Sequence, residues 1–265
     1  MTELLKLAES ELGYLEKSRE AYRLYGANCL YDKEKYAGAD NVTKYSYELY
    51  QRGLGHPEYQ PWCQTFIAWL YWKIFGAELA NKLLCGKLRS ASTMDVKDAF
   101  FAQGRGVPLN KAKPGDIVYR SRNGGGHVGL VVGRASNGKI ISIEGNSSAS
   151  DITSWNGGAV VKHTGASWEW CVRPDYTLVD YHWVEDNGTW YYQNGLGQNR
   201  HGWDKIKETQ GDYYHWYWFD SKGAMATNSR EIDGSWYFFQ PDGPLEGAQC
   251  ITDSNGALNV WSMSE

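Results

Sequence analysis

Leucine and alanine recur at helical spacing through the first 24 residues of the chain, with charged residues between them. This pattern predicts an amphipathic helix over residues 3–24. Apolar positions with a period near 3.6 predict further helices over residues 43–54, 62–75 and 92–103. The first half of the chain is therefore expected to be mainly helical.

The pattern changes after residue 113, where short apolar runs alternate with turn residues. These runs predict strands at 117–119, 127–132, 139–144, 159–163 and 169–172. Asn137-Gly138 is a strong two-residue hairpin signal, so at least two of the strands are antiparallel neighbours. Helices followed by an antiparallel sheet describe an α+β domain with the helices packed on the sheet, which we expect to span residues 1–176.

A different pattern occupies residues 177–265, where aromatic blocks repeat. Three blocks begin with Trp190, Trp216 and Trp236, and a glycine follows each of these by seven residues. Each block predicts a strand, a turn and a return strand. One such hairpin cannot bury its aromatic face alone, so we expect a small all-β domain of stacked hairpins, solenoid-like in form.

Composition limits the classes of function. The 265 residues are 42% hydrophobic and 22% charged, with a net charge of -4, so no basic surface for nucleic acid is expected. No apolar stretch is long enough for membrane insertion. The N-terminus lacks the basic start and apolar centre of a secretory signal, which predicts synthesis in the cytoplasm.

The five cysteines have wide spacings and include no Cys-x-x-Cys pair. We therefore expect free thiols, no metal and no cofactor. Cys63 differs from the others because it follows Pro61 at the predicted start of a helix. The unpaired N–H groups and the dipole of a helix start favour a thiolate, which is the nucleophilic form of cysteine.

Two later segments supply partners for a nucleophilic Cys63. His127 begins a strand after a run of glycines, and Glu144 and Asn146 close the next strand of the hairpin. A base and a group that orients it are what thiol attack on an amide requires. Taken singly, the cysteine is more often a buried structural residue, the histidine a strand-end side chain and the glutamate a solvated carboxylate. Their combination favours catalysis.

The segments WCQTFIAWLYWKIFG, KPGDIVYR, GGGHVGLVVG and ISIEGNSS, together with AESELGYLEKS and RPDY, resemble the CHAP domain (cysteine, histidine-dependent amidohydrolase/peptidase) over residues 3–176. The resemblance implies a papain-like fold and cleavage of bacterial peptidoglycan. It implies Cys63 as nucleophile, His127 as base and acid, and Glu144 as the residue orienting His127, with Asn146 filling or assisting that role. Calcium, bound by some members, is not carried over, because the acidic residues before Cys63 form no ligand-spaced loop.

Substrate contacts are expected beside the nucleophile and in the aromatic half. We expect Gln60 and Trp62 to contact the substrate, Gln60 as an oxyanion donor together with the N–H of Cys63. GTWYYQNGLGQNRHGW and GSWYFFQPDG resemble cell-wall-binding repeats of choline-binding and glucan-binding proteins. The implied ligand contacts are Trp190, Trp203, Trp216 and Trp236, which would hold choline, a wall glycan or a teichoic acid.

The combined prediction is a peptidoglycan hydrolase of the phage endolysin type, released to the wall by a holin. The scissile bond stays open between an N-acetylmuramoyl-L-alanine amide and a peptide bond of the stem or crossbridge. One alternative is a host autolysin or a toxin-like effector with the same chemistry. Another is a non-catalytic wall-binding protein with a relic peptidase domain. A third is a protein whose function is dominated by a sugar-binding module, so that residues 177–265 alone bind the wall and no lysis occurs.

Overall fold

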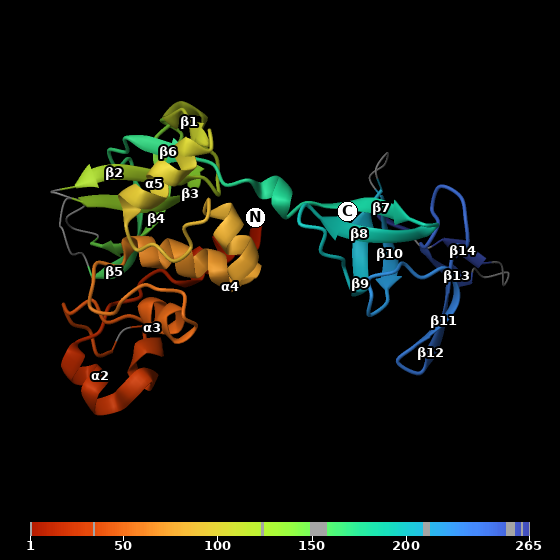
Figure 1. Cartoon of the computed structure of the whole chain (residues 1–265), viewed down its shortest axis with the longest axis horizontal. Helices are drawn as coiled ribbons and strands as arrows, with labels where there is room; N and C mark the ends of the chain where they lie inside the picture. Colours follow the sequence, from red (N-terminus) through yellow and green to blue (C-terminus); the bar gives the residue numbers. More distant parts are fainter. Residues whose placement is uncertain are drawn as a thin grey trace. The chain divides into compact units, whose positions relative to one another are not determined.

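The computed structural model describes residues 2–33, 35–122, 125–148, 158–208, 213–252, 258–260 and 262–264. The chain divides into two compact units, residues 1–176 and 177–265, called unit 1 and unit 2 below (Figure 1). Unit 1 is an α+β unit and unit 2 consists of small β hairpins, so the predicted fold class is confirmed.

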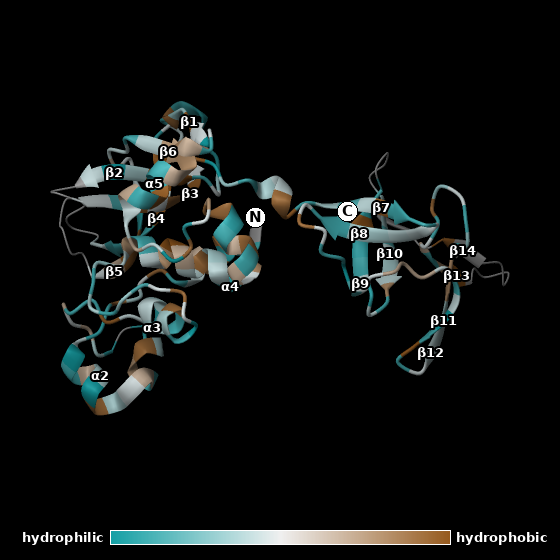
Figure 2. Cartoon of the chain, in the orientation of Figure 1, coloured by the Kyte–Doolittle hydropathy of each residue, from teal (hydrophilic) through white to brown (hydrophobic). Residues whose placement is uncertain are grey.

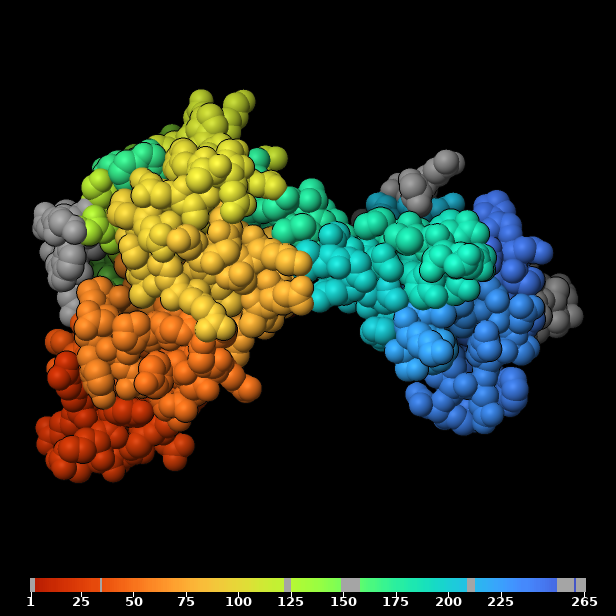
Figure 3. Space-filling view, viewed as in Figure 1, coloured from red at the N-terminus to blue at the C-terminus, as the bar shows by residue number. Residues whose placement is uncertain are grey.

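The helical part of unit 1 comes first along the chain. Its helices are α1 (Thr2–Ser10), α2 (Arg19–Tyr25), η1 (Gly26–Tyr31), α3 (Lys44–Gln51), α4 (Cys63–Leu83), α5 (Thr93–Ala102) and η2 (Leu109–Lys111), and η3 (Tyr176–Leu178) follows the sheet. Ser18, Thr43 and Ser92 cap α2, α3 and α5, each accepting a backbone N–H three residues on. Figure 3 shows the N-terminal residues (red and orange) as one continuous surface with the α4 region.

The single helix predicted over residues 3–24 is wrong. Gly13 has a φ of 82°, and the chain then runs extended, with bridges from Leu15 to Ala159 and from Lys17 to Val42. Backbone hydrogen bonds to distant segments replace helical ones here, and Tyr14 is fully buried. Tertiary pairing has overridden a helical periodicity that was locally present.

Helix α4 extends beyond the predicted end at residue 75. Gly76 has non-helical angles (φ 71°, ψ 172°), which breaks the regular helix there before helical turns resume to Leu83. The glycine therefore ends the first helical segment as expected, while the second segment was missed. The first segment is buried on all sides from Cys63 to Tyr71, including the polar residues Gln64 and Thr65.

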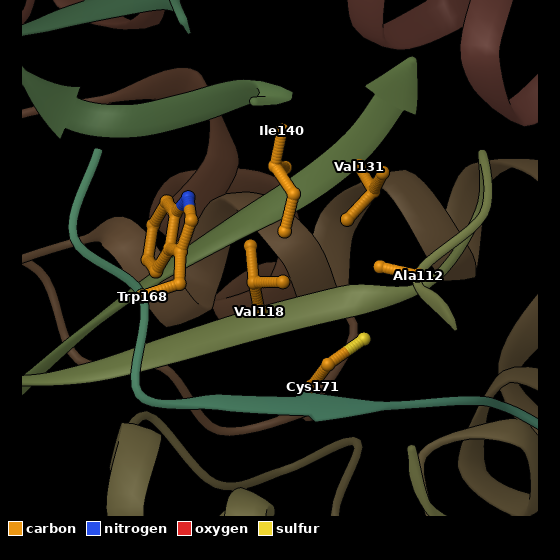
Figure 4. Packing of buried hydrophobic residues seen from close by; sticks show 6 residues of the cluster. All are labelled: Ala112, Val118, Val131, Ile140, Trp168 and Cys171. Carbon is orange, nitrogen blue, oxygen red and sulfur yellow. The ribbon is translucent and has the colours of Figure 1, made fainter. Parts of the chain in front are cut away.

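The sheet of unit 1 is antiparallel throughout, in the order β1-β6-β2-β3-β4-β5. Its strands are β1 (Gly106–Val107), β2 (Ile117–Arg122), β3 (Gly125–Arg134), β4 (Ile140–Ser147), β5 (Ala159–Thr164) and β6 (Trp170–Val172). Gly145 marks where α4 meets β4, because a Cβ at that position would lie 2.6 Å from the Phe66 Cβ. An apolar cluster packs between sheet and loops; Figure 4 shows Ala112, Val118, Val131, Ile140, Trp168 and Cys171.

Unit 2 is built from hairpins with aromatic side chains. Its strands are β7 (Tyr181–Asp186), β8 (Thr189–Asn194), β9 (Gly202–Lys207), β10 (Tyr213–Phe219), β11 (Asn228–Ile232), β12 (Ser235–Phe239), β13 (Gln249–Thr252), β14 (Leu258–Val260) and β15 (Ser262–Ser264). The pairs β7–β8, β9–β10 and β11–β12 are antiparallel. Much of β7 to β10 is pale in Figure 2 because Trp and Tyr lie near the middle of that hydropathy scale, although several of these rings pack in or against the core of unit 2.

The aromatic blocks are the second strands of these hairpins, β8, β10 and β12. The principal partner of each block therefore precedes it, whereas the sequence predicted a return strand after it. Asn187-Gly188 and Asp233-Gly234 make the tight turns of the first and third hairpins with positive φ at both positions, as type I′ turns require. After β12 a return strand does follow, since β12 also pairs with β13.

Candidate active site and aromatic cavities

Cys63 is the first residue of α4 and is 6% exposed. Its thiol donates to the carbonyl oxygen of Gly126, with an Sγ–O distance of 4.0 Å, so it lies beside the residue that precedes His127. The first N–H groups of a helix have no partner within the helix, and the helix dipole is positive at that end. Cys63 is therefore placed where a thiolate, and an oxyanion formed next to it, are stabilised.

Trp62 holds the start of this helix from inside the unit. It is 1% exposed, and its indole Nε1 donates to Glu16 Oε2 at 2.7 Å. Burial raises the pKa of Glu16, and the hydrogen bond from Trp62 acts in the opposite direction. The Trp62 ring has no open surface, so it supports the helix start instead of contacting substrate as the sequence suggested. Gln60, by contrast, is exposed just before Cys63.

His127 and Glu144 form a buried pair on the neighbouring strands β3 and β4. The distance from His127 Nε2 to Glu144 Oε2 is 2.8 Å, and the two side chains are 2% and 0% exposed. Because Nε2 is engaged by the carboxylate, Nδ1 is the ring nitrogen that can take the thiol proton. The imidazole also stacks on the indole of Trp168, with ring centres 6.1 Å apart and planes 7° apart.

Glu144 is surrounded by hydrogen-bond donors. Ser142 Oγ donates to its Oε1 at 2.8 Å, and Ser147 Oγ donates to its Oε2 at 3.4 Å. Burial by itself would raise the pKa of Glu144, but the hydrogen bond and charge of His127, together with Ser142, hold it below the ordinary value. The carboxylate is therefore ionised and suited to stabilise a positively charged imidazole.

Asn146 is 2% exposed and has a φ of 54°. Its Oδ1 is buried without a hydrogen-bond partner among the described residues. Glu144, and not this atom, therefore accepts from the His127 ring. The conformation of Asn146 matters in another way, because the register of β4 with β5 shifts between Glu144 and Ser147.

Several residues around the site were not anticipated. Ser142 lies two residues before Glu144 on the same strand. Because side chains alternate along a strand, the sequence could have shown that Ser142 and Glu144 lie on the same face of the sheet. Glu16, Trp168 and His163 are far from Cys63 in the sequence, on either side of it, and no local pattern connects them to it. Gly129 gives space to this cluster, since a Cβ there would lie 3.0 Å from both Glu144 Cγ and the Trp168 ring.

Unit 2 contains two cavities with the same aromatic arrangement. The first, of about 320 Å³, is lined by Trp203, Trp216, Tyr237 and Gln249. The Trp203 ring lies 6.5 Å from that of Trp216 at 81°, and 4.9 Å from that of Tyr237 at 67°. Two tryptophans from hairpin β9–β10 thus meet a tyrosine of the next block.

The second cavity, of about 210 Å³, repeats this geometry one hairpin earlier. The Trp183 ring lies 6.4 Å from that of Trp190 at 90°, and 4.9 Å from that of Tyr217 at 63°. Three charged residues, Lys207, Glu208 and Glu246, also line this cavity. The block tyrosines therefore take part beside the tryptophans expected from the sequence.

Trp236 is the predicted ligand contact that lines neither cavity. It is 71% exposed, and the third block contributes the following residue, Tyr237, instead. Side chains alternate along a strand, so Trp236 and Tyr237 face opposite sides of β12. The signal that would have identified Tyr237 and Tyr217 is their shared position directly after the block tryptophan.

Two further observations concern metals and membranes. Within the described residues, no group of three or more His, Cys, Asp or Glu side chains is arranged to hold a metal ion. In the same part of the chain, no helix combines the length and apolar character needed to cross a membrane.

Comparison with known proteins identifies both parts of the chain. Residues 55–146 match the family model of the CHAP domain, and residues 183–197 and 230–245 match that of the putative cell wall binding repeat. No curated protein matches the chain.

Among solved structures, the choline binding domain of Spr1274 in Streptococcus pneumoniae is 27% identical, covering 28% of this chain and 98% of that one, with a TM-score of 0.22. CbpF in complex with ipratropium is 20% identical, covering 51% of each chain, with a TM-score of 0.22. The Cpl-1 endolysin complexed with a peptidoglycan analogue is 22% identical, covering 56% of this chain and 39% of that one, with a TM-score of 0.20.

The chain thus spans about half of CbpF and about two fifths of the endolysin, and TM-scores of this size do not establish a shared fold. The family models carry the assignment instead. The chain contains a CHAP domain and, C-terminal to it, cell wall binding repeats.

Proposed function

We propose that this protein is a cysteine-dependent peptidoglycan hydrolase of the endolysin type. Its substrate is an amide bond in the stem peptide or crossbridge of a Gram-positive wall. The observation that carries the proposal is the buried His127–Glu144 pair next to Cys63 at a helix start, within a CHAP domain.

The reaction begins with proton transfer from the Cys63 thiol to His127 Nδ1. The thiolate attacks the amide carbonyl carbon, and the oxyanion is held by the Cys63 N–H, with Gln60 as the second donor. The tetrahedral intermediate collapses when His127 returns its proton to the leaving amine, which leaves a thioester on Cys63. Water, deprotonated by His127, attacks the thioester and releases the carboxylic acid and the thiol. Glu144 stabilises the imidazolium in both halves.

The test of catalysis is Cys63→Ala, with Cys85→Ala as control. Cys85 lies outside the site and is only partly buried. Purified Gram-positive walls should lose turbidity with the wild type and with Cys85→Ala, and not with Cys63→Ala. Lysis by Cys63→Ala would contradict the assignment. Absence of lysis by all three would favour a non-catalytic wall-binding protein.

The bond that is cut distinguishes an N-acetylmuramoyl-L-alanine amidase from an endopeptidase. Mass spectrometry of fragments released from digested walls separates these outcomes. Free L-alanine N-termini on released peptides identify the amidase, whereas intact lactyl-peptide linkages with new termini inside the peptide identify the endopeptidase. Both products are compatible with the thioester route above.

For the wall-binding part, we propose that both aromatic cavities bind quaternary ammonium groups such as choline. A cation is attracted to the faces of Trp and Tyr rings, and rings meeting at steep angles enclose it from several sides. Glu208 and Glu246 line the second cavity together with Lys207, so carboxylates outnumber ammonium groups among its lining residues. A neutral wall glycan would stack on the same rings without needing the carboxylates.

Substitutions in the first cavity test this ligand. Tyr237→Ala should weaken choline binding at that cavity at least about tenfold, since cation–π contacts that lose water contribute roughly 2 kcal/mol. Trp236→Ala, one residue away and outside the cavity, should bind normally. The measurement is calorimetric titration with choline, with a glycan fragment as the competing ligand. Equal loss in both variants would contradict the cavity as the site.

The endolysin role requires an exit to the wall. We propose that a holin-type pore supplies it, as opposed to the export expected of a host autolysin. Expression inside a susceptible cell should lyse that cell only when a holin is co-expressed. Lysis without a holin would favour the autolysin alternative.

A further inference from the structure

A second histidine is connected to the site through a serine. His163 Nε2 lies 3.1 Å from Ser147 Oγ, and Ser147 Oγ lies 3.4 Å from Glu144 Oε2, the oxygen that contacts His127. His163 is 9% exposed and Ser147 is 1% exposed. These contacts form a buried series of hydrogen bonds that leads from His163 through Ser147 and Glu144 to His127.

The strand register explains why these side chains meet. His163 on β5 lies opposite Ser142 on β4, so it shares the side of the sheet used by Ser142 and Glu144. Ser147 is three residues after Glu144, and in a regular strand it would face the other side. The register shift between Glu144 and Ser147, at the left-handed Asn146, turns Ser147 back toward Glu144.

The number of hydrogens on Ser147 decides which atom donates in each of these hydrogen bonds. A serine hydroxyl carries one hydrogen, so when Ser147 donates to Glu144 it must accept from its other neighbour. His163 then has to carry its hydrogen on Nε2. In the opposite tautomer, Ser147 would donate to His163 and Glu144 would lose a donor.

We propose that His163 and Ser147 are positioning residues of the site: the His163 Nε2–H orients the Ser147 hydroxyl toward Glu144. Glu144 is thereby held as an anion facing His127. This inference rests on the proposed function of Cys63, His127 and Glu144. It assigns neither His163 nor Ser147 a contact with substrate.

The experiment compares His163→Phe with His163→Gln in the full-length protein. Phenylalanine keeps a ring but lacks a donor, whereas the glutamine amide can place an N–H near the former Nε2. Lys162→Gln is the matched control, since Lys162 lies on the same strand and its side chain makes a surface ion pair with Glu9. Each variant is first checked for unchanged thermal unfolding.

Two readouts are measured for each variant. The first is kcat and KM on a soluble peptidoglycan fragment. The second is the rate of Cys63 alkylation by iodoacetamide against pH, followed on the Cys63 peptide by mass spectrometry. Because a weaker Glu144 stabilises the thiolate–imidazolium pair less, the alkylation midpoint of His163→Phe should move to higher pH.

We expect His163→Phe to lose about tenfold in kcat with KM nearly unchanged, as loss of one buried hydrogen bond predicts. His163→Gln should recover most of the rate and the alkylation midpoint, and Ser147→Ala should behave like His163→Phe. Equal behaviour of His163→Phe and His163→Gln, whether both active or both inactive, would overturn the inference. If the wild type hydrolyses no fragment, the proposed function fails, while the alkylation midpoints still decide whether His163 acts through Glu144.

Discussion

We expect the charge state of Glu144 to affect both activity and stability. It is fully buried, and its carboxylate accepts from His127, Ser142 and Ser147. Glu144→Gln keeps the size and an acceptor but removes the charge that stabilises imidazolium. We expect kcat on a soluble fragment to fall at least about 100-fold, by analogy with neutral replacement of a buried carboxylate in a catalytic triad. A variant with nearly full activity would contradict the role given to Glu144.

The lowered pKa of Glu144 also predicts that the free energy of unfolding depends on pH. The pKa of Glu144 is lower in the folded protein than its ordinary value, so the carboxylate contributes stability above the unfolded pKa of about 4.3. That contribution is lost as the pH falls through the folded pKa. Urea unfolding should therefore show the largest difference between wild type and Glu144→Gln near pH 7 and little difference at pH 2. Glu9→Gln, at a half-exposed ion pair, is the control and should change little.

At the scale of elements, α4, which begins at the candidate nucleophile Cys63, packs closely against β4, the strand that carries Glu144. A Cβ at Gly145 would lie 2.6 Å from Phe66 Cβ and 2.8 Å from the Trp62 ring. Gly145→Ala must therefore displace backbone or packed side chains and should destabilise the protein by about 1–3 kcal/mol. Gly133→Ala on β3 has its nearest neighbour at 3.9 Å and should be nearly neutral. Denaturant unfolding compares the two variants, and equal stabilities would contradict this close approach.

Local signals predicted most elements and failed where distant segments compete. Ser92 and Thr43 cap helices where the periodicity begins, and both helices were anticipated. Residues 13–18 have helical periodicity but pair with residues 37–42 and 158–160, which local sequence cannot reveal. In unit 2 the aromatic blocks were recognised as strands, but the Asn187-Gly188 turn was not read as the connection that pairs β8 with the strand before it.

At the scale of the whole molecule, catalysis and wall binding are expected to separate along the chain. Cys63, His127 and Glu144 lie in unit 1, and both aromatic cavities lie in unit 2. Removing residues 177–265 should leave kcat/KM on a soluble fragment within about twofold, because Glu144 and its hydrogen-bond partners His127, Ser142 and Ser147 all lie in unit 1. The same truncation should abolish sedimentation with intact walls. A large loss on the soluble fragment would show that unit 2 contributes to the reaction itself.

The sequence by itself determined the α+β class, the CHAP resemblance, the place of the candidate nucleophile Cys63 at a helix start and the aromatic repeats. These depend on signals within a few residues of one another, namely capping, alternation and turn chemistry. Only the tertiary structure decided that Trp62 supports Cys63 from within, that Tyr237 replaces Trp236 in a cavity, and that His163 reaches Glu144. The physical reason is that strand register and helix-to-sheet packing bring together segments that share no local pattern. The candidate triad was therefore readable residue by residue, while its supporting contacts were not.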